Sequence, residues 1–189
     1  MDAVAAAFAA TPREAFLPEG ERERADDDWP LPIGHGQTCS QPRTVEDLLR
    51  LLAVEPGQRV LDVGAGSGWT TALIAHLTGP SGEVVGVEIE PDLARWGAGN
   101  LATVDRPWAT LRAATPGVLG DPLHAPYDRI LVSADARTLP RALLDQLADR
   151  GRLVVPVRGA LTLAVRSGDD VRTSVHGYYR FVPLRDHVR

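Results

Sequence analysis

The sequence predicts a doubly wound α/β fold with a mostly parallel sheet, and two observations support this prediction. From residue 59 onward, short apolar runs typical of strands alternate with segments that carry a helical pattern. The first of these runs ends in Asp62 and leads into the sequence G-x-G-x-G, formed by Gly64, Gly66 and Gly68. In open α/β sheets a ligand binds beyond the carboxyl ends of the strands. A strand, a glycine turn and a helix in this order therefore predict a site for a nucleoside cofactor.

The first 58 residues are predicted to form an N-terminal segment of helices and loops. An alanine-rich stretch at residues 4–10 indicates a helix, whereas the charged run at residues 19–28 is interpreted as a solvated loop. From residue 45 to residue 52 apolar residues recur with the spacing of one helix face, and a Pro-Gly pair at 56–57 ends that helix. We expect residues 1–58 and the core at 59–189 to form one compact domain, since 44% hydrophobic content suffices for a single core.

The core is predicted to alternate between strands and helices. Strands are expected at residues 59–63, 83–88, 129–133 and 152–157, and helices at residues 70–77, 91–102 and 139–151. The last helix is inferred from Leu139, Leu143 and Leu147 on one face, with Gly151 as its stop. After it, two runs at residues 161–166 and 171–182 flank the turn sequence SGDD and predict a C-terminal antiparallel strand pair.

Charge and cysteine content exclude several classes of function. The net charge is -5 and the 20 basic residues are scattered, which gives no footprint for nucleic acid or for an anionic membrane. All 20 are arginines, which excludes a lysine nucleophile. The five histidines lack metal-ligand spacing, no apolar run reaches the ~20 residues that cross a bilayer, and no secretory leader opens the chain. With Cys39 as its single cysteine, we expect a metal-free cytoplasmic monomer.

The glycine turn and the end of the next strand predict the residues that hold the cofactor. The dinucleotide fingerprint G-x-G-x-x-G needs its third glycine at the position of Trp69, so NAD or FAD is the weaker interpretation and a dehydrogenase is disfavoured. Glu88 ends the second strand, where its carboxylate can accept hydrogen bonds from both ribose hydroxyls. An ordinary tight turn and a solvated carboxylate are the alternatives. The predicted cofactor-binding residues are Asp62, Gly64, Ala65, Gly66, Ser67, Gly68 and Glu88.

Five further motifs follow one another along the chain. They are PREAFLP at 12–18, PLPIGHGQTCSQP at 30–42, APYDRILVSA at 125–134, LPRALLDQLADRGRLVVPV at 139–157 and RFVPL at 180–184. Through these motifs and their order, the chain resembles the S-adenosylmethionine-dependent methyltransferases, and more narrowly the protein-L-isoaspartate O-methyltransferases. The resemblance implies a Rossmann-like fold of the class I methyltransferase type, with S-adenosyl-L-methionine as cofactor and S-adenosyl-L-homocysteine as product. It also implies that the methyl group is transferred to the free α-carboxylate of L-isoaspartyl residues in proteins or peptides, a reaction of protein repair.

The motif at residues 30–42 contains the predicted substrate residues. By the resemblance, Ser40 matches the serine of the family's T-I-S motif, whose hydroxyl holds the substrate carboxylate. We therefore predict Ser40 as the catalytic residue and Gln37, Thr38 and Ser40 as substrate-binding residues. The alternative is that Ser40 caps the following helix, which has Pro42 in its first turn. Cys39 is interpreted as a small packed apolar residue.

Two segments depart from the resemblance. Pro116 stands where the family carries an acidic residue that contacts the adenine amino group, and Asp121 is a carboxylate that could replace it. Asp135 and Arg137 stand where the family has small residues and a proline, so they either alter substrate choice or pair with each other. Two alternatives therefore stay open. One is a methyltransferase of the same family dedicated to an Asp or isoAsp in one peptide, and the other is a catalytically weak binding protein on a methyltransferase fold.

Overall fold

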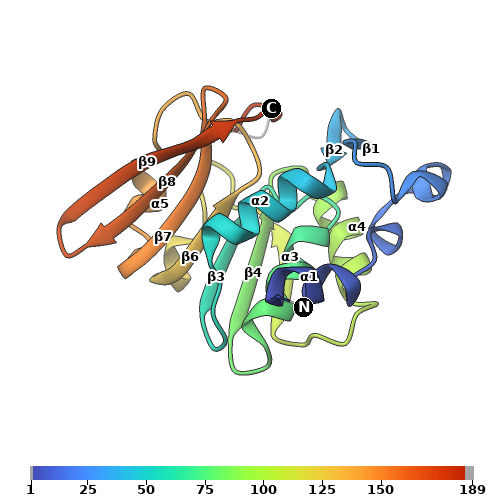
Figure 1. The fold of residues 1–189 in the computed structure, drawn as a ribbon, viewed down its shortest axis with the longest axis horizontal. Coiled ribbons are helices and arrows are strands. Elements are labelled where there is room, and N and C mark those ends of the chain that lie inside the picture. Colours follow the sequence, from blue (N-terminus) through green and yellow to red (C-terminus); the bar gives the residue numbers. More distant parts are fainter. Residues whose placement is uncertain (1, 186–189) are drawn as a thin grey trace.

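The structure, a computed structural model, describes residues 2–185, which form a large sheet and a separate two-stranded hairpin (Figure 1). The strands of the large sheet are β3 (Arg59–Val63), β4 (Glu83–Glu88), β5 (Ala109–Ala113), β6 (Tyr127–Val132), β7 (Leu147–Val157), β8 (Ala160–Ser167) and β9 (Asp170–Tyr178). Their order is β5-β4-β3-β6-β7-β8-β9, with parallel pairing from β5 to β7 and antiparallel pairing from β7 to β9. The predicted α/β fold with a C-terminal antiparallel strand pair is confirmed.

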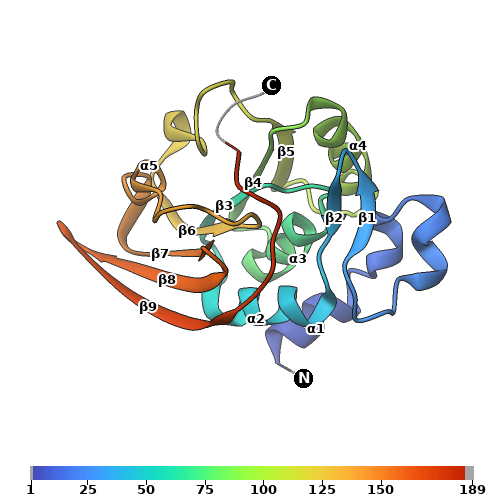
Figure 2. The same cartoon turned by 90° about the horizontal axis from the view of Figure 1, so that it is seen from above.

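Helices cover the two faces of this sheet, and the alternation of strand residues gives each face its own core (Figure 2). Val60 and Val84 lie in a buried cluster with residues of four helices, whereas their neighbours Leu61 and Val85 lie in a second cluster with α5. The first cluster also contains Phe16, so the segments 1–58 and 59–189 contribute to one core. The helices are α1 (Ala3–Ala9), α2 (Pro42–Leu52), α3 (Trp69–Thr78), α4 (Pro91–Leu101) and α5 (Arg141–Leu144).

The helix predicted at residues 139–151 is wrong over most of its length. Only Arg141–Leu144 is helical, and both Leu147 and Gly151 belong to strand β7. Leu147 pairs with Tyr127 of β6, and both side chains are buried in the second core cluster. The leucine spacing fits a helix, but strand pairing and burial across the sheet decide the local structure here.

Four further segments differ from the prediction. The hairpin formed by β1 (Leu31–Gly34) and β2 (Gln37–Cys39) was not predicted, and neither was strand β5 at the edge of the sheet. The run at residues 19–28 is largely exposed, as expected, but Glu19–Arg24 forms a 3₁₀ helix. The last strand, β9, ends at Tyr178 rather than at residue 182. These elements are short or lie at edges, where the local pattern carries little information.

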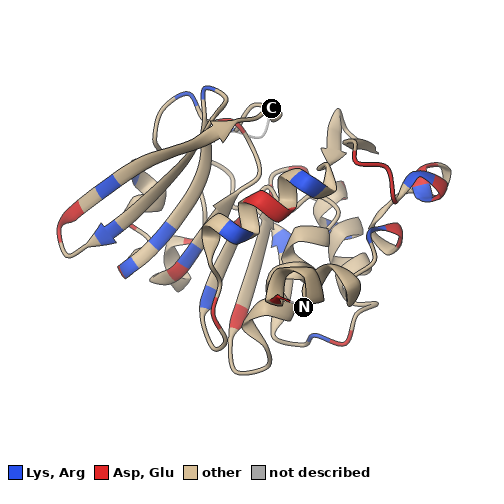
Figure 3. Ribbon diagram, in the orientation of Figure 1, with Lys and Arg blue, Asp and Glu red and all other residues tan. Residues whose placement is uncertain are grey.

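Charged side chains are dispersed over the fold. Figure 3 shows basic and acidic positions interspersed along α2 and on the strands. Within residues 2–185, no group of His, Cys, Asp and Glu side chains is arranged to hold a metal ion. None of the helices in the same part of the chain is long and apolar enough to cross a bilayer.

Candidate functional site

A cavity opens at the carboxyl ends of β3, β4, β5 and β6, the position at which doubly wound sheets bind ligands. Its floor is formed by the residues that follow these strands, at positions 64–67, 88–89, 114–120 and 133–134. Two segments from outside the parallel strands complete the wall, residues 37–40 of the hairpin and residues 182–185. Figure 2 shows the hairpin and the C-terminal segment over α3 and the strand ends. The cavity thus joins distant parts of the chain.

The glycine turn after β3 adopts a left-handed backbone conformation. Gly64, Gly66 and Gly68 have φ angles of 80°, 53° and 85°, which glycine accommodates without a steric penalty. A Cβ atom on Gly68 would lie 2.8 Å from the carbonyl oxygen of Gly97 in α4. The turn therefore needs glycine for its own conformation and for the close packing of α4. Gly68 also begins α3 without a side-chain cap, which leaves the first N–H groups of that helix without side-chain acceptors.

The two predicted carboxylates have different surroundings. Glu88 lines the cavity, and its carboxylate accepts hydrogen bonds from the backbone N–H groups of Gly66 (2.9 Å) and Glu90 (3.0 Å). Asp62 is fully buried and does not line the cavity. Its Oδ2 atom accepts a hydrogen bond from the Thr71 hydroxyl (2.7 Å), whereas its Oδ1 atom has no hydrogen-bond partner among residues 2–185. Burial raises the pKa of Asp62 to about 7, and the charge of Glu88 adds to this rise.

The predicted cofactor residues therefore fall into two groups. Those that line the cavity are Gly64, Ala65, Gly66, Ser67 and Glu88. Asp62 and Gly68 do not line the cavity and contact α3 instead, Asp62 by its hydrogen bond from Thr71 and Gly68 as the residue before the helix.

Ser40 lines the same cavity, together with Gln37 and Thr38. The alternative role of Ser40 as a helix cap is wrong, because the residue at the cap position of α2 is Gln41. The side chain of Gln41 makes no capping hydrogen bond. The carboxylate of Asp28 takes this role from outside, since its Oδ1 accepts a hydrogen bond from the backbone N–H of Arg43 (3.0 Å). The Ser40 hydroxyl is thus not engaged in capping and can serve a ligand.

Arg13, which sequence analysis did not single out, holds the hairpin in place. Its buried guanidinium donates hydrogen bonds to backbone carbonyls, including those of Trp29 (2.8 Å) and Cys39 (2.9 Å), and lies 5.5 Å from the ring centroid of Trp69. The Trp69 indole, at the start of α3, donates to the carbonyl of Thr11 (3.0 Å). Cys39 is packed in the first core cluster, and burial raises the pKa of its thiol, as expected for an unreactive residue. The motif PREAFLP was the sequence signal for this anchor.

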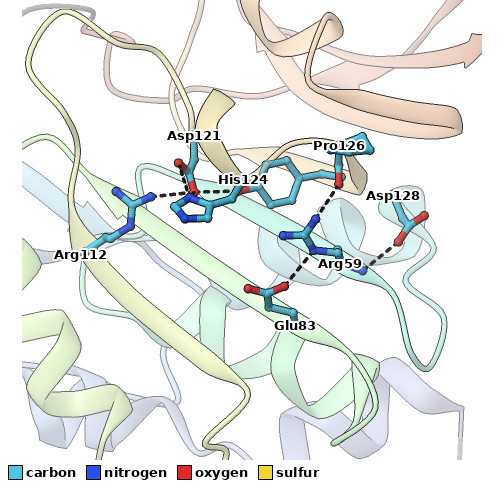
Figure 4. A network of polar contacts seen from close by, with 8 residues as sticks. Arg59, Glu83, Arg112, Asp121, His124, Pro126 and Asp128 are labelled. Atoms are coloured by element: carbon cyan, nitrogen blue, oxygen red, sulfur yellow. Dashed lines mark hydrogen bonds and ion pairs between the residues drawn. The ribbon is translucent and has the colours of Figure 1, made fainter.

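The loop after β5, residues 114–120, forms the wall that contains Pro116. The next residue, Asp121, is 4% exposed, and its carboxylate is bound by Arg112 (2.6 Å), His124 (2.9 Å) and the Tyr127 hydroxyl (2.8 Å), as Figure 4 shows for the arginine and the histidine. Burial acts to raise the pKa of Asp121, but the hydrogen bonds from these partners lower it overall. Asp121 therefore anchors the end of the loop and does not offer a free acceptor to a ligand.

Asp135 and Arg137 do not line the cavity, and the ion pair considered between them is absent from residues 2–185. The Oδ1 atom of Asp135 accepts a hydrogen bond from the N–H of Gly159 (2.9 Å). Its backbone pairs with the C-terminal segment, through the carbonyl of Val182 (2.8 Å) and the N–H of Leu184 (2.9 Å). Asp135 thus helps to hold residues 182–185 against the cavity.

Three segments meet beside the cavity at Glu90, which precedes α4. Arg185 of the C-terminal segment forms an ion pair with this carboxylate (2.7 Å). His35 in the turn of the hairpin lies 4.0 Å from its other oxygen. The backbone N–H of Glu90 donates a hydrogen bond to the Glu88 carboxylate. The contacts that join the two outer segments are therefore directly connected to Glu88.

Comparison with known proteins assigns this architecture to a family. The model of the family "Protein-L-isoaspartate(D-aspartate) O-methyltransferase" matches residues 1–189. Proteins named protein-L-isoaspartate O-methyltransferase are 43% identical in Methanopyrus kandleri over 186 residues and 46% identical in Aeropyrum pernix over 151 residues. These alignments cover 96% and 80% of this chain, respectively. The chain spans 82% of the Methanopyrus protein and 58% of the Aeropyrum protein.

Solved structures agree with this assignment. A protein-L-isoaspartate O-methyltransferase aligns over 98% of this chain and 62% of its own, with a TM-score of 0.89 and 24% identity, which shows a common fold. A putative protein-L-isoaspartate O-methyltransferase from Plasmodium falciparum, solved in complex with S-adenosyl-L-homocysteine, aligns over 99% of this chain and 92% of its own, with a TM-score of 0.82 and 25% identity. The chain therefore belongs to the protein-L-isoaspartate(D-aspartate) O-methyltransferase family.

Proposed function

We propose that this protein transfers the methyl group of S-adenosyl-L-methionine to the free α-carboxylate of L-isoaspartyl residues in proteins or peptides. Its family supports this reaction. The single observation that carries the proposal is that one cavity is lined both by the glycine turn with Glu88 and by Ser40 with its neighbours. Carboxyl methylation requires a methyl donor and a carboxylate held side by side, and this cavity has a candidate binding surface for each.

The residues around the glycine turn fit S-adenosyl-L-methionine. Trp69 and Thr70, at the uncapped start of α3, line the cavity, so their backbone N–H groups can bind a carboxylate such as that of the methionine part. The Glu88 carboxylate can accept hydrogen bonds from the ribose hydroxyls. When bound, the cofactor supplies an electrophilic methyl group on a sulfonium. We propose that Gly64, Ala65, Gly66 and Ser67 form the wall along it, with Asp62 and Gly68 as supports behind that wall.

On the substrate side we propose that the Ser40 hydroxyl donates a hydrogen bond to one oxygen of the isoaspartyl α-carboxylate. Gln37 and Thr38 line the cavity beside it and would hold the neighbouring peptide. The carboxylate is already ionised at neutral pH, so the protein needs no general base. Its contribution is the alignment of the two reactants, which can account for roughly 7–11 kcal/mol of a barrier.

The proposed reaction is tested by transfer of a labelled methyl group to a matched pair of peptides that differ only in Asp or isoAsp. The product is scored as base-labile methanol. We expect transfer to the isoAsp peptide alone. No transfer to a panel of unrelated isoAsp peptides, with S-adenosyl-L-homocysteine shown to bind, would instead support a dedicated peptide substrate. Absence of cofactor binding would support the weak binding protein.

We further propose that one copy of the chain suffices for this reaction, since all predicted site residues come from a single chain. The dispersed charge supports a protein or peptide as the partner rather than nucleic acid or a membrane. A cytoplasmic location is supported by the single, buried and unpaired Cys39.

A further inference from the structure

The strand β9 has an unprotected edge. It is the last strand of the large sheet (Figure 1), and all of its residues are exposed. Its only partner in the described structure is β8, so the backbone groups on its other side face solvent. Val171 and Val175 are among the exposed large apolar residues, at 39% and 57%. Proteins usually protect such an edge with proline, bulges or inward-pointing charges, but β9 has no proline and a register shift only near its end.

The turn before β9 decides which of its backbone groups point outward. Ser167 of β8 pairs with Asp170 across a two-residue turn, and Gly168 in that turn has a φ of 60°, as in a type II′ turn. Residues that flank such a turn exchange hydrogen bonds with each other, and the direction of these groups alternates along the strand. The backbone groups of Asp170 therefore face β8, whereas those of Val171, Thr173 and Val175 face outward.

The regular part of β9 is self-complementary. It is bounded by the turn on one side and, on the other, by a register shift beyond Val175, so Thr173 lies near its centre. In an antiparallel pair of two copies centred on Thr173, Val171 of each copy lies opposite Val175 of the other, on the same face. On the opposite face, Asp170 of each copy lies opposite His176 of the other. Apolar residues thus meet apolar residues, a carboxylate meets an imidazole, and the charged Arg172 lies opposite Ser174.

We propose that β9 is a self-association edge, through which two copies of this chain pair in antiparallel fashion about Thr173. The result is a two-fold symmetric dimer with one sheet that runs through both copies. One strand from each copy makes a small interface, below about 1,200 Å², so the dimer is weak and forms as the concentration rises. None of the residues of β9 lines the cavity, and methyl transfer does not depend on the dimer.

Thr173→Cys tests the register, because a residue on the two-fold axis lies opposite its own copy and within the range of a disulfide. The only native cysteine, Cys39, is buried, so the wild-type chain is the control for other crosslinks. Matched controls are Val171→Cys and Ser174→Cys. In this register, the cysteine of one copy lies too far from the same cysteine of the other copy to form a disulfide. Under mild oxidation at 100 µM, we expect a disulfide-linked dimer to form at least tenfold faster for Thr173→Cys than for either control.

Sedimentation velocity of the wild-type chain from 1 to 500 µM tests the association itself. We expect the weight-average mass to rise with concentration, and Thr173→Pro to remove this rise because it deletes an outward N–H group and no bond to β8. A wild-type chain that stays monomeric up to 500 µM overturns the proposal, as do equal crosslinking rates for the three cysteine variants. Methyl transfer to the isoAsp peptide, measured on the same samples, is expected to be unchanged, so failure of the dimer and failure of the proposed enzyme function are distinguishable.

Discussion

Glu88 is the carboxylate that we propose to bind the ribose on the cofactor side of the cavity. Glu88→Gln keeps the side-chain shape but removes the negative charge of the carboxylate, whose oxygens accept the hydrogen bonds. Hydrogen bonds to a charged group contribute about 1.5–3 kcal/mol, so binding of S-adenosyl-L-homocysteine should weaken roughly 10- to 100-fold in calorimetric titration. Glu83→Gln, at the exposed other end of β4, is the matched control and should bind normally. Equal affinities for the two variants would contradict the assigned role.

Ser40 is expected to affect turnover and not cofactor affinity. Its hydroxyl lines the cavity and is not the cap of α2, so Ser40→Ala should leave the melting temperature and the affinity for S-adenosyl-L-homocysteine nearly unchanged. Loss of substrate alignment should lower kcat by about 10²-fold, as small misplacements do. A lower melting temperature with a normal kcat would show that the serine is structural after all.

Asp62 should give the cofactor-free protein an unusual pH dependence. Its pKa is raised from 3.8 to about 7 by burial, so the folded state holds a proton that the unfolded state has released between these values. The free energy of unfolding therefore falls as the pH rises from about 4 to about 7, by up to ~4 kcal/mol. Asp62→Asn keeps an acceptor for Thr71 and should flatten this part of the profile. Urea unfolding of both proteins at pH 4 and pH 8 measures the difference, and parallel profiles would rule the effect out.

At the scale of elements, the packing of α4 against the glycine turn can be probed with two glycines. Gly68→Ala would place a Cβ 2.8 Å from the Gly97 carbonyl at a positive φ, so we expect a loss of about 1–3 kcal/mol in unfolding free energy. Gly99→Ala, within α4 and with open space around it, should instead stabilise the protein by about 0.5–1 kcal/mol. Denaturant titrations of both variants are the measurement. If both substitutions changed the unfolding free energy with the same sign, helix propensity would dominate over the close approach to the Gly97 carbonyl.

Helices and strands whose apolar sequence pattern matches their burial could be predicted. Those whose structure depends on contacts with residues distant in the sequence could not. β3 and β4 have the boundaries expected from their apolar runs, because both strands are buried along nearly their whole length. Leu147 has helical spacing to its neighbours, yet pairing with Tyr127 makes it part of β7. The short hairpin β1–β2 is held by Arg13 through backbone carbonyls. The motif PREAFLP contains Arg13, but it does not show which carbonyls this residue binds.

At the scale of the whole molecule, binding in the cavity should stabilise the fold, because its wall includes segments from residue 33 to residue 185. Ligand at 100 times its Kd adds about 2.7 kcal/mol to the unfolding free energy. For a chain of this size, we expect S-adenosyl-L-homocysteine to raise the Tm by roughly 5–10 °C. Differential scanning fluorimetry measures this shift, and Glu88→Gln at the same ligand concentration should show a smaller one. An unchanged Tm in the wild-type chain would contradict the proposed cofactor site.

The fold, and most of the residues that line the cavity at the glycine turn and the hairpin, could be predicted from the sequence. The glycine turn, the strand ends and the motif at residues 30–42 are local patterns. The contacts that bring these residues together are not local. Arg185 reaches Glu90, Asp135 holds residues 182 and 184, and Asp121 closes the loop after β5 with Arg112. Each of these joins segments whose separation along the chain carries no periodic signal.

The position of residues 182–185 in the cavity wall has a consequence for the way the protein is made. Domains generally begin to fold from the N-terminus while the ribosome is still at work. The glycine turn and Glu88 emerge early, but the wall that includes Arg185 is added only after every strand of the large sheet has been made. A nascent chain would therefore have to fold its sheet without help from the ligand, and the cavity would be completed only after residue 185 has emerged.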